Sequence, residues 1–241
     1  MANQIPNASP NVYARIGGVT YLIIIAAGLF GEMYVRNSIV VAKDAMATAK
    51  NIMDHPTLWR LGIAGDLLMH ICDIVLMTIF YILLKPVNRH LALMALLFNI
   101  VQTSVLVLNK LNLLMPLFLL DPAAYLNVID PAQRDALSYV FIRSHGYGFG
   151  LGLIFFGFTC ITMGVLIFKS GYLPKTLGIL MQIAGICYLI NSFALIIAPA
   201  LADNLFPFIL LPPFIGELSL CLWLLIKGVN ETKWKAMAMQ A

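Results

Sequence analysis

The sequence predicts an all-α protein, a polytopic bundle of six transmembrane helices with short amphipathic outer helices. Of its 241 residues, 61% are hydrophobic and only 11% are charged. Soluble domains carry about 25% charged residues, so this chain has too few charges to cover a surface that faces water. Six separate apolar stretches also reach the length of about 20 residues that a membrane-spanning helix needs.

The apolar stretches occupy most of the chain and are separated by gaps of unequal length. We expect spans at about 14–35, 58–84, 90–117, 143–169, 175–199 and 205–227. Between the first two, residues 40–54 place their apolar side chains at helical spacing, with the lysines mostly on another face. This pattern predicts a short amphipathic helix in the membrane interface. The pair Asp130-Pro131 is typical of a helix start, and it predicts a short helix from Ala132 into the fourth span.

Basic residues predict the orientation of the bundle. If the N-terminus lies in the cytoplasm, the two tight inner turns read KPVNRH and KSGYLPK, and both are basic. The opposite side is then close to neutral. We therefore expect a polar cytoplasmic N-terminus at 1–13, a six-helix transmembrane domain at 14–228 and a short cytoplasmic tail at 229–241. The predicted location is the inner (plasma) membrane, with multiple passes.

Several ionisable and amide residues lie inside these spans. Such a charged residue costs at least about 2.5–3.5 kcal/mol at the centre of the bilayer, so it usually faces a partner or a cavity. Asp66, His70 and Asp73 share one helical face because they are four and three residues apart. Most of these groups fall in the outer half of the membrane, which predicts one polar cavity open to the outside. The candidate ligand-binding residues are Asp66, His70, Asp73, Asn109, Lys110, His145, Asn191 and Glu217.

A structural role for the same residues is the alternative. Intramembrane amides often only join neighbouring helices, for about 0.6 kcal/mol each. Lys110 and Arg36 can extend toward the outer surface, and Arg36 can pair with Glu32 four residues earlier. The glycines at 146, 148, 150 and 152 form two G-x-x-x-G pairs, which predict close helix contacts.

The favoured function is binding or translocation of a small polar solute, a proton or a lipid headgroup by a non-enzymatic membrane protein. The first alternative is an intramembrane metal-dependent enzyme, because the spacing of Asp66 and His70 is compatible with shared coordination. However, the sequence has no HExxH motif, so we predict no metal site and assign no catalytic residue. The second alternative is a non-catalytic structural or partner-binding membrane protein.

The partners expected from the sequence are the lipid bilayer and a small polar ligand or lipid. The net charge of +4 is modest and comes from residues at helix ends, so it does not indicate a nucleic-acid partner. The sequence identifies no cofactor and no oligomeric state.

Six stretches carry a resemblance to a known family: RIGGVTYLIIIAAGLFGEMYVR, RLGIAGDLLMHICDIVLM, YILLKPVNRHLALMALLFNIVQ, SHGYGFGLGLIFFG, KSGYLPKTLGILMQIAGICYLINSF and FIGELSLCLWLLIKGV. Over about 13–230 the chain resembles an uncharacterised bacterial multi-pass integral membrane family, a domain of unknown function, and KSGYLPKTLG is the most specific part. The resemblance implies a compact inner-membrane bundle and no known reaction. Asp66, Asp73, His145 and Glu217 lie in matching stretches, whereas His70 stands where an apolar residue is expected.

Overall fold

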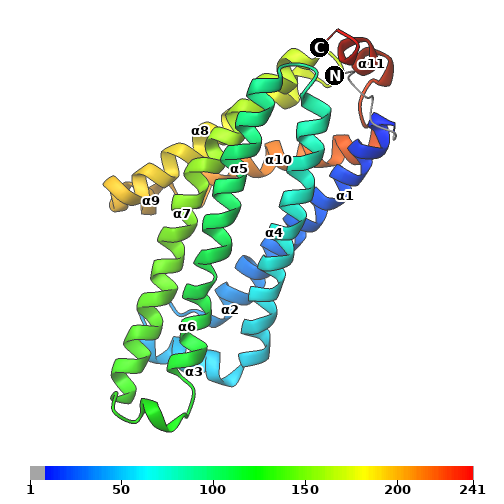
Figure 1. Ribbon diagram of the computed structural model, residues 1–241. Coiled ribbons are helices and arrows are strands. Elements are labelled where there is room, and N and C mark those ends of the chain that lie inside the picture. The colour runs from blue at the N-terminus through cyan, green and yellow to red at the C-terminus, as the bar shows by residue number, and fades with distance from the viewer. Residues whose placement is uncertain (1–8, 241) are drawn as a thin grey trace. The chain divides into compact units, whose positions relative to one another are not determined.

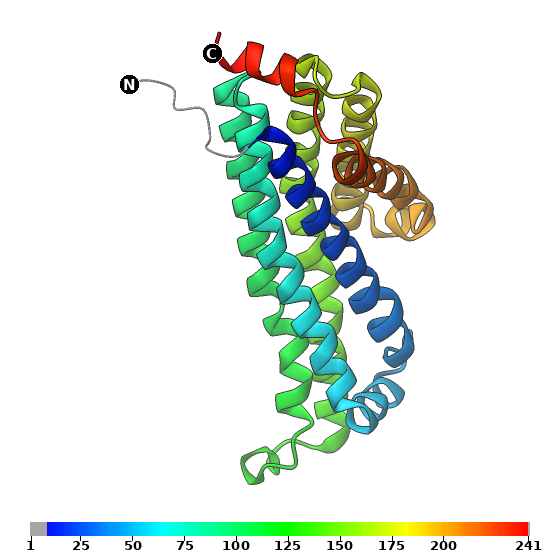
Figure 2. The same ribbon diagram turned by 90° about the vertical axis from the view of Figure 1, so that its right-hand side faces the viewer.

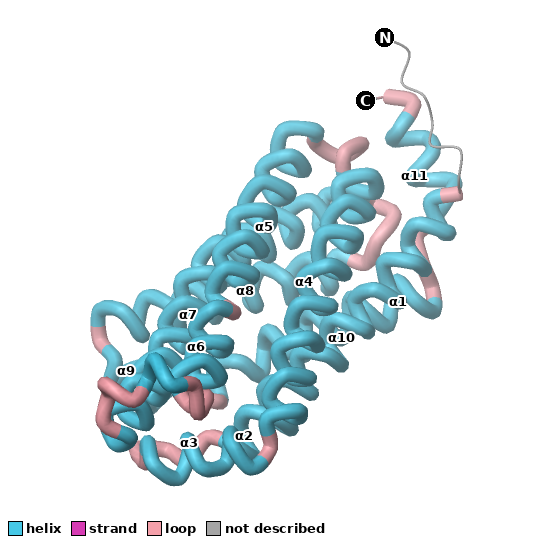
Figure 3. The backbone as a smooth tube through the Cα atoms, turned by 60° about the horizontal axis from the view of Figure 1, so that its bottom comes forward, coloured by secondary structure: helices cyan, strands magenta, loops and turns pink. Residues whose placement is uncertain are grey.

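The structure is a computed structural model that describes residues 9–240. These residues form helices joined by short turns, and no strand occurs among them (Figure 3). Six helical segments within this range are long and apolar enough to cross a membrane. The predicted all-α, six-span bundle is therefore confirmed, and the protein is a multi-pass membrane protein. Of the predicted terminal segments, residues 1–8 and 241 lie outside the described residues.

Figure 1 shows the helices in chain order, from blue to red. They are α1 (Pro10–Leu29), the π-helix η1 (Phe30–Arg36), α2 (Asn37–Ile39), α3 (Ala45–Asp54), α4 (Pro56–Leu84), α5 (Arg89–Asn109), α6 (Leu111–Leu119), the 3₁₀-helix η2 (Ala124–Leu126), α7 (Pro131–Ser170), α8 (Lys175–Ile197), α9 (Pro199–Leu205), the 3₁₀-helix η3 (Phe208–Leu210), α10 (Leu211–Ile226) and α11 (Glu231–Ala238). The spans are α1 to α2, α4, α5 to α6, α7, α8, and η3 to α10.

The fourth span is longer than the sequence predicts. The short helix expected from Ala132 is continuous with that span, so α7 is a single helix of 40 residues. Asp130 stands just before it, and its Oδ1 atom accepts a hydrogen bond of 2.9 Å from the backbone N–H of Ala132. The first turn of α7 thus gains a partner for one of its free N–H groups, as the Asp-Pro pair predicts.

The described chain divides into two compact units, and α1, α4, α5 and α7 contribute to both. The first unit contains residues 9–23, Cys72–Thr103 and 150–240. The second unit contains Ile24–Ile71 and Ser104–Phe149. Each unit thus combines segments that lie far apart in the sequence.

Close backbone contacts join α7 and α8 in the first unit. A Cβ atom built on Gly178 would lie 2.6 Å from the carbonyl oxygen of Gly164, and one built on Gly185 would lie 2.5 Å from that of Gly157. Any larger residue at these positions would force the two backbones apart. Small residues therefore set the distance between these helices, as is common in membrane bundles.

The two ends of the described chain meet in the first unit, where α11 (red) lies near the first turns of α1 (blue) in Figure 2. Asn11 Oδ1 accepts a hydrogen bond of 2.9 Å from the backbone N–H of Val229. Ser9 Oγ donates to Glu231 Oε2 at 3.2 Å. These two hydrogen bonds join the first helix to the last helix of the described chain.

The second unit has its own apolar core. The indole of Trp59 is 1% exposed, and its Nε1–H donates to the carbonyl oxygen of Leu113 at 2.8 Å. This bond satisfies the polar atom of a buried tryptophan and ties α4 to α6. The buried residues of this core are Val35, Ile39, Ile52, Trp59, Ile63 and Leu113.

The amphipathic helix predicted at 40–54 is present but shorter, because α3 begins only at Ala45. Asp44 precedes it with an extended backbone, and its carboxylate accepts a hydrogen bond from the N–H of Ala47 at 2.9 Å. Residues 40–44 are therefore a turn and cap rather than helix. Ile52 faces the core of the second unit, whereas Met46 is 69% exposed.

Candidate functional site

A buried ion-pair network in the second unit is centred on Asp66 of α4. Its Oδ2 atom lies 2.8 Å from Nη1 of Arg36 and 2.9 Å from Nζ of Lys110. The side chains of Asp66, Lys110 and Arg36 are 1%, 3% and 13% exposed. Arg36 also contacts Glu32 at 2.6 Å, but the side chain of Glu32 is 59% exposed. One buried carboxylate therefore holds two cations.

Both cations come from places where a helix departs from α-geometry. Arg36 is the last residue of the π-helix η1, and Lys110 lies between the end of α5 and the start of α6. At that break the N–H of Lys110 donates to the carbonyl of Val107, three residues back, at 3.1 Å. π-Bulges and broken helices recur at functional sites of proteins. Because one of each brings a cation to Asp66, this ion-pair network is the candidate functional site.

Two histidines adjoin the network. Nε2 of His145 lies 3.4 Å from Nζ of Lys110. His70 follows Asp66 by one turn of α4, and its ring interacts electrostatically with Lys110 and Asp66. His70 is only 2% exposed, yet its Nε2 atom has no hydrogen-bond partner among residues 9–240. A buried polar atom without a partner costs about 1–3 kcal/mol, which makes His70 the unsatisfied member of the cluster.

Asn109 fixes the position of the neighbouring helix. Its Nδ2 group donates to the backbone carbonyl of His145 at 2.9 Å, and its Oδ1 atom accepts from Nδ2 of Asn112 at 2.8 Å. A Cβ atom on Gly148 of α7 would overlap Oδ1 of Asn109. A glycine on α7 therefore gives the amide room to reach the backbone beside His145.

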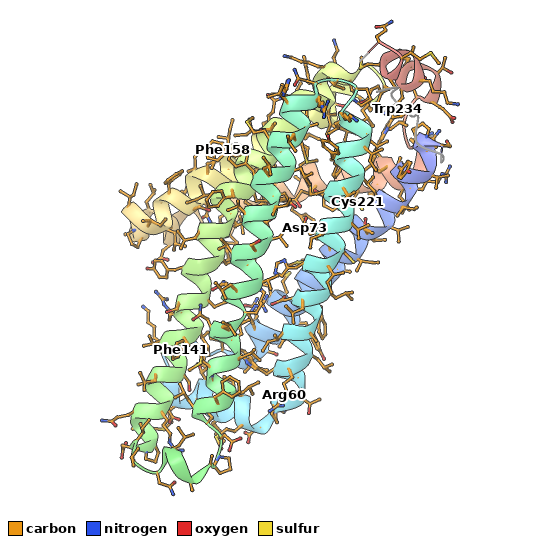
Figure 4. The ribbon with its side chains drawn as sticks, in the orientation of Figure 1. Arg60, Asp73, Phe141, Phe158, Cys221 and Trp234 are labelled. Atoms are coloured by element: carbon orange, nitrogen blue, oxygen red, sulfur yellow. The ribbon has the colours of Figure 1, made fainter. Side chains whose placement is uncertain are left out.

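Asp73 of α4 has a different environment in the first unit (Figure 4). It is 8% exposed, and its partners come from α5. Thr103 Oγ donates to Oδ2 at 2.5 Å, and Asn99 Nδ2 lies 3.1 Å from the same oxygen and 3.3 Å from Oδ1. Gln102 Oε1 in turn accepts from Asn99 Nδ2 at 3.0 Å. All of these partners are uncharged.

Glu217 of α10 is the third carboxyl group within a span. Its Oε1 atom accepts a hydrogen bond of 2.5 Å from the hydroxyl of Tyr188 on α8. The hydroxyl of Tyr21 on α1 also interacts with this carboxyl group. Like Asp73, Glu217 is held by neutral groups of the first unit, in contrast to Asp66 with its two cations.

The candidate residues divide between the two units. Asp66, His70, Asn109, Lys110 and His145 lie in the second unit, around the ion-pair network. The first unit holds the others: Asp73 and Glu217 have the separate partners described above, and Asn191 is half-buried. Five of the eight candidates therefore form one cluster.

Two expectations about single residues need correction. Lys110 does not extend outward; it is 2% exposed and paired with Asp66. Arg36 makes the expected pair with Glu32, but it also reaches Asp66. Of the expected glycine pairs, Gly146 meets no atom within 4 Å of a built Cβ, so it mediates no close helix contact.

Sequence reasoning missed three hydroxyl groups. Thr103 contacts Asp73, and Tyr21 and Tyr188 contact Glu217. Thr103 carried a signal, because it follows Asn99 by four residues and so lies on the same helical face. The two tyrosines carried none, because nothing in the sequence brings their helices to α10.

The described part of the chain contains no group of three or more His, Cys, Asp or Glu side chains arranged to hold a metal ion. Zinc sites take at least three protein ligands. Asp66 and His70, which motivated the metal-dependent alternative, therefore lack a third donor of these types within residues 9–240.

Comparison with known proteins extends this description. Residues 16–228 match the family described as "Domain of unknown function (DUF4386)". The chain belongs to this family. The resemblance inferred from its sequence stretches is thereby confirmed. A relative from Archaeoglobus fulgidus, itself named "Uncharacterized protein", is 29% identical over 175 residues, which are 72% of this chain and 86% of the relative. No solved structure matches this DUF4386 chain.

Proposed function

We propose that this DUF4386 protein binds a small anionic group, a carboxylate or a phosphate, at the Asp66 cluster of the second unit. The observation that carries the proposal is the charge balance of the buried groups. Arg36 and Lys110 supply two positive charges and Asp66 supplies one negative charge, while the remaining acid, Glu32, is mostly exposed. The buried part of the network thus carries an excess of one positive charge.

An anionic ligand offsets this excess and finds free donors in the cluster. The Lys110 ammonium has three N–H donors, and contacts with Asp66 and His145 occupy two of them. The imidazole of His70, buried and with Nε2 unpaired, offers another polar atom. The irregular helix segments at Arg36 and Lys110 support a binding role, since broken helices recur at transporter sites.

A carboxylate or phosphate group has two sources in a membrane, a free solute and a lipid headgroup. Thermal unfolding of the full chain in neutral detergent, at constant ionic strength, tests the free anions: inorganic phosphate and acetate, with chloride as reference. Unfolding in nanodiscs of phosphatidylglycerol against phosphatidylcholine tests the headgroup. We expect a rise in Tm with at least one of these anionic probes, because ligands that bind only the folded state stabilise it.

Matched variants locate the effect. Lys110→Gln should abolish the rise in Tm, and Lys233→Gln should keep it, because Lys233 is an exposed lysine of α11. His70→Leu is the second test, since His70 Nε2 has no partner to lose within the described residues and the variant should stay folded. An anion response that is equal in wild type, Lys110→Gln and His70→Leu, or no response to any probe, refutes the proposal.

A further inference from the structure

The first unit contains a buried carboxyl group whose surroundings suit both of its protonation states. Asp73 is 8% exposed, and Asn99, Gln102 and Thr103 around it are 1%, 6% and 4% exposed. It lies eleven residues before the end of α4, or about 17 Å along the helix. This distance is half or more of the thickness of a hydrocarbon core, which is about 30 Å.

Within residues 9–240, Asp73 forms no ion pair with a cation. Its hydrogen-bond partners within residues 9–240 are the amide of Asn99 and the hydroxyl of Thr103. The titratable groups that interact with it electrostatically are Cys72 on α4, Cys160 on α7 and Glu217 on α10. None of them carries positive charge, and Glu217 adds a second acid.

The hydroxyl of Thr103 lets the site hold a proton without losing hydrogen bonds. With Asp73 ionised, Thr103 Oγ–H donates to Oδ2 at 2.5 Å. With Asp73 protonated, the carboxyl O–H donates to Thr103 Oγ instead. The threonine hydrogen then turns to Oε1 of Gln102, which lies 3.4 Å away. A hydroxyl group both donates and accepts, so one rotation connects the two states.

We propose that Asp73 is a proton-binding site of this protein, with Thr103 and Gln102 as the groups that accommodate the bound proton. Asp73 takes up one proton from water, and its charge changes from −1 to 0. Thr103 acts as a positioning residue, because it holds the carboxyl group and reverses the direction of its hydrogen bond. Asp73, Thr103 and Gln102 belong to the first unit and share no residue with the anion site of the second unit.

Infrared difference spectroscopy of the full chain in liposomes, recorded between acidic and alkaline pH, tests this proposal. A protonated carboxyl group has a C=O stretching band that a carboxylate lacks. We expect Asp73→Asn to remove one component of the pH-dependent carboxylic acid band, and Glu217→Gln to leave that component in place. A band that is unchanged by Asp73→Asn overturns the proposal.

Substitutions at Thr103 test the role of the hydroxyl and do not depend on the folding of Asp73→Asn. Thr103→Val keeps the shape of the side chain but removes the acceptor, so the Asp73 band should shift in frequency and its titration midpoint should change. Thr103→Ser restores the hydroxyl and should restore both. Identical spectra and midpoints for Thr103→Val and wild type contradict the proposed arrangement.

Discussion

Asp66 and Lys110 form a 2.9 Å ion pair between two side chains that are 1% and 3% exposed. The same carboxylate binds Arg36 at 2.8 Å. Taking charges out of water is costly, so each of these groups depends on its partners. Asp66 is the only acid with which the buried Lys110 forms an ion pair in residues 9–240, and the network is therefore sensitive to the loss of this one carboxylate.

Asp66→Asn should destabilise the protein strongly. It leaves the buried Lys110 without its anion and Arg36 with Glu32 alone, and removal of one partner of a buried pair costs about 3–5 kcal/mol. Chemical unfolding in detergent measures the change. Glu32→Gln is the control, because that side chain is 59% exposed and exposed pairs contribute only about 0.2–1 kcal/mol. Equal losses in the two variants would contradict a network centred on Asp66.

The six spans were predictable because membrane insertion depends on the composition of each segment by itself. Segments such as 58–84 contain enough apolar residues to span the hydrocarbon core whatever their neighbours are. The ionisable residues inside them, Asp66 and Lys110 among them, were identifiable for the same reason, since each stands out against an apolar background.

The partners of these residues were not predictable from the chain. The pairing of Asp66 with Lys110 depends on how α4 and α5 are rotated about their axes. The contact with Arg36 also depends on the π-helix η1, which changes the direction in which side chains leave the helix. From regular helical spacing, the only partner predicted for Arg36 is Glu32, four residues earlier.

Gly148→Ala should destabilise the second unit. Its Cβ would overlap Oδ1 of Asn109, so either α7 moves away or the bond from Asn109 to the His145 carbonyl is lost. Insertion of extra atoms into a packed site typically costs about 1–3 kcal/mol. Gly146→Ala is a closely matched control on the same helix, because its Cβ meets nothing within 4 Å.

The two glycine variants should change the free energy of unfolding in different directions. Alanine is a better helix former than glycine by about 1 kcal/mol, so Gly146→Ala should be neutral or stabilising in the same unfolding experiment. Adding Asn109→Ser to Gly148→Ala shortens the obstructing side chain and should recover part of the loss. A Gly148→Ala variant as stable as Gly146→Ala would mean that Asn109 yields without cost.

The carbonyl oxygen of Leu83 anchors α11, because it accepts both Trp234 Nε1 at 2.9 Å and the hydroxyl of Tyr172 at 2.5 Å. Burial raises the pKa of Tyr172, so its hydroxyl stays protonated at neutral pH and remains a donor to Leu83. Trp234→Phe removes the indole hydrogen bond to Leu83. It should lower the free energy of unfolding by about 0.5–1.5 kcal/mol, the usual net contribution of one hydrogen bond, with a further loss from packing.

Hydrogen exchange locates this effect. The amides of α11 should exchange faster in Trp234→Phe, whereas those of the Asp66 cluster should not change. Tyr172→Phe leaves the indole bond intact and should have a smaller effect on α11. Tyr172 and Trp234 donate to the same carbonyl oxygen. The loss of stability in the double variant Trp234→Phe/Tyr172→Phe should therefore differ from the sum of the two single losses. Unchanged exchange in α11 after Trp234→Phe would show that the helix is held elsewhere.

We propose that both ends of the chain lie in the cytoplasm, as the basic inner turns predict. The hydrogen bond from the backbone N–H of Val229 to Asn11 supports a common side for both ends. The segment at Val128, after three spans, is then expected on the opposite side. In intact cells, a membrane-impermeant thiol reagent should label Val128→Cys, which is 89% exposed. Ser9→Cys and Lys233→Cys should react only after permeabilisation. The reverse labelling pattern would invert the orientation, and labelling of Ser9→Cys and Lys233→Cys from opposite sides would contradict the even number of crossings.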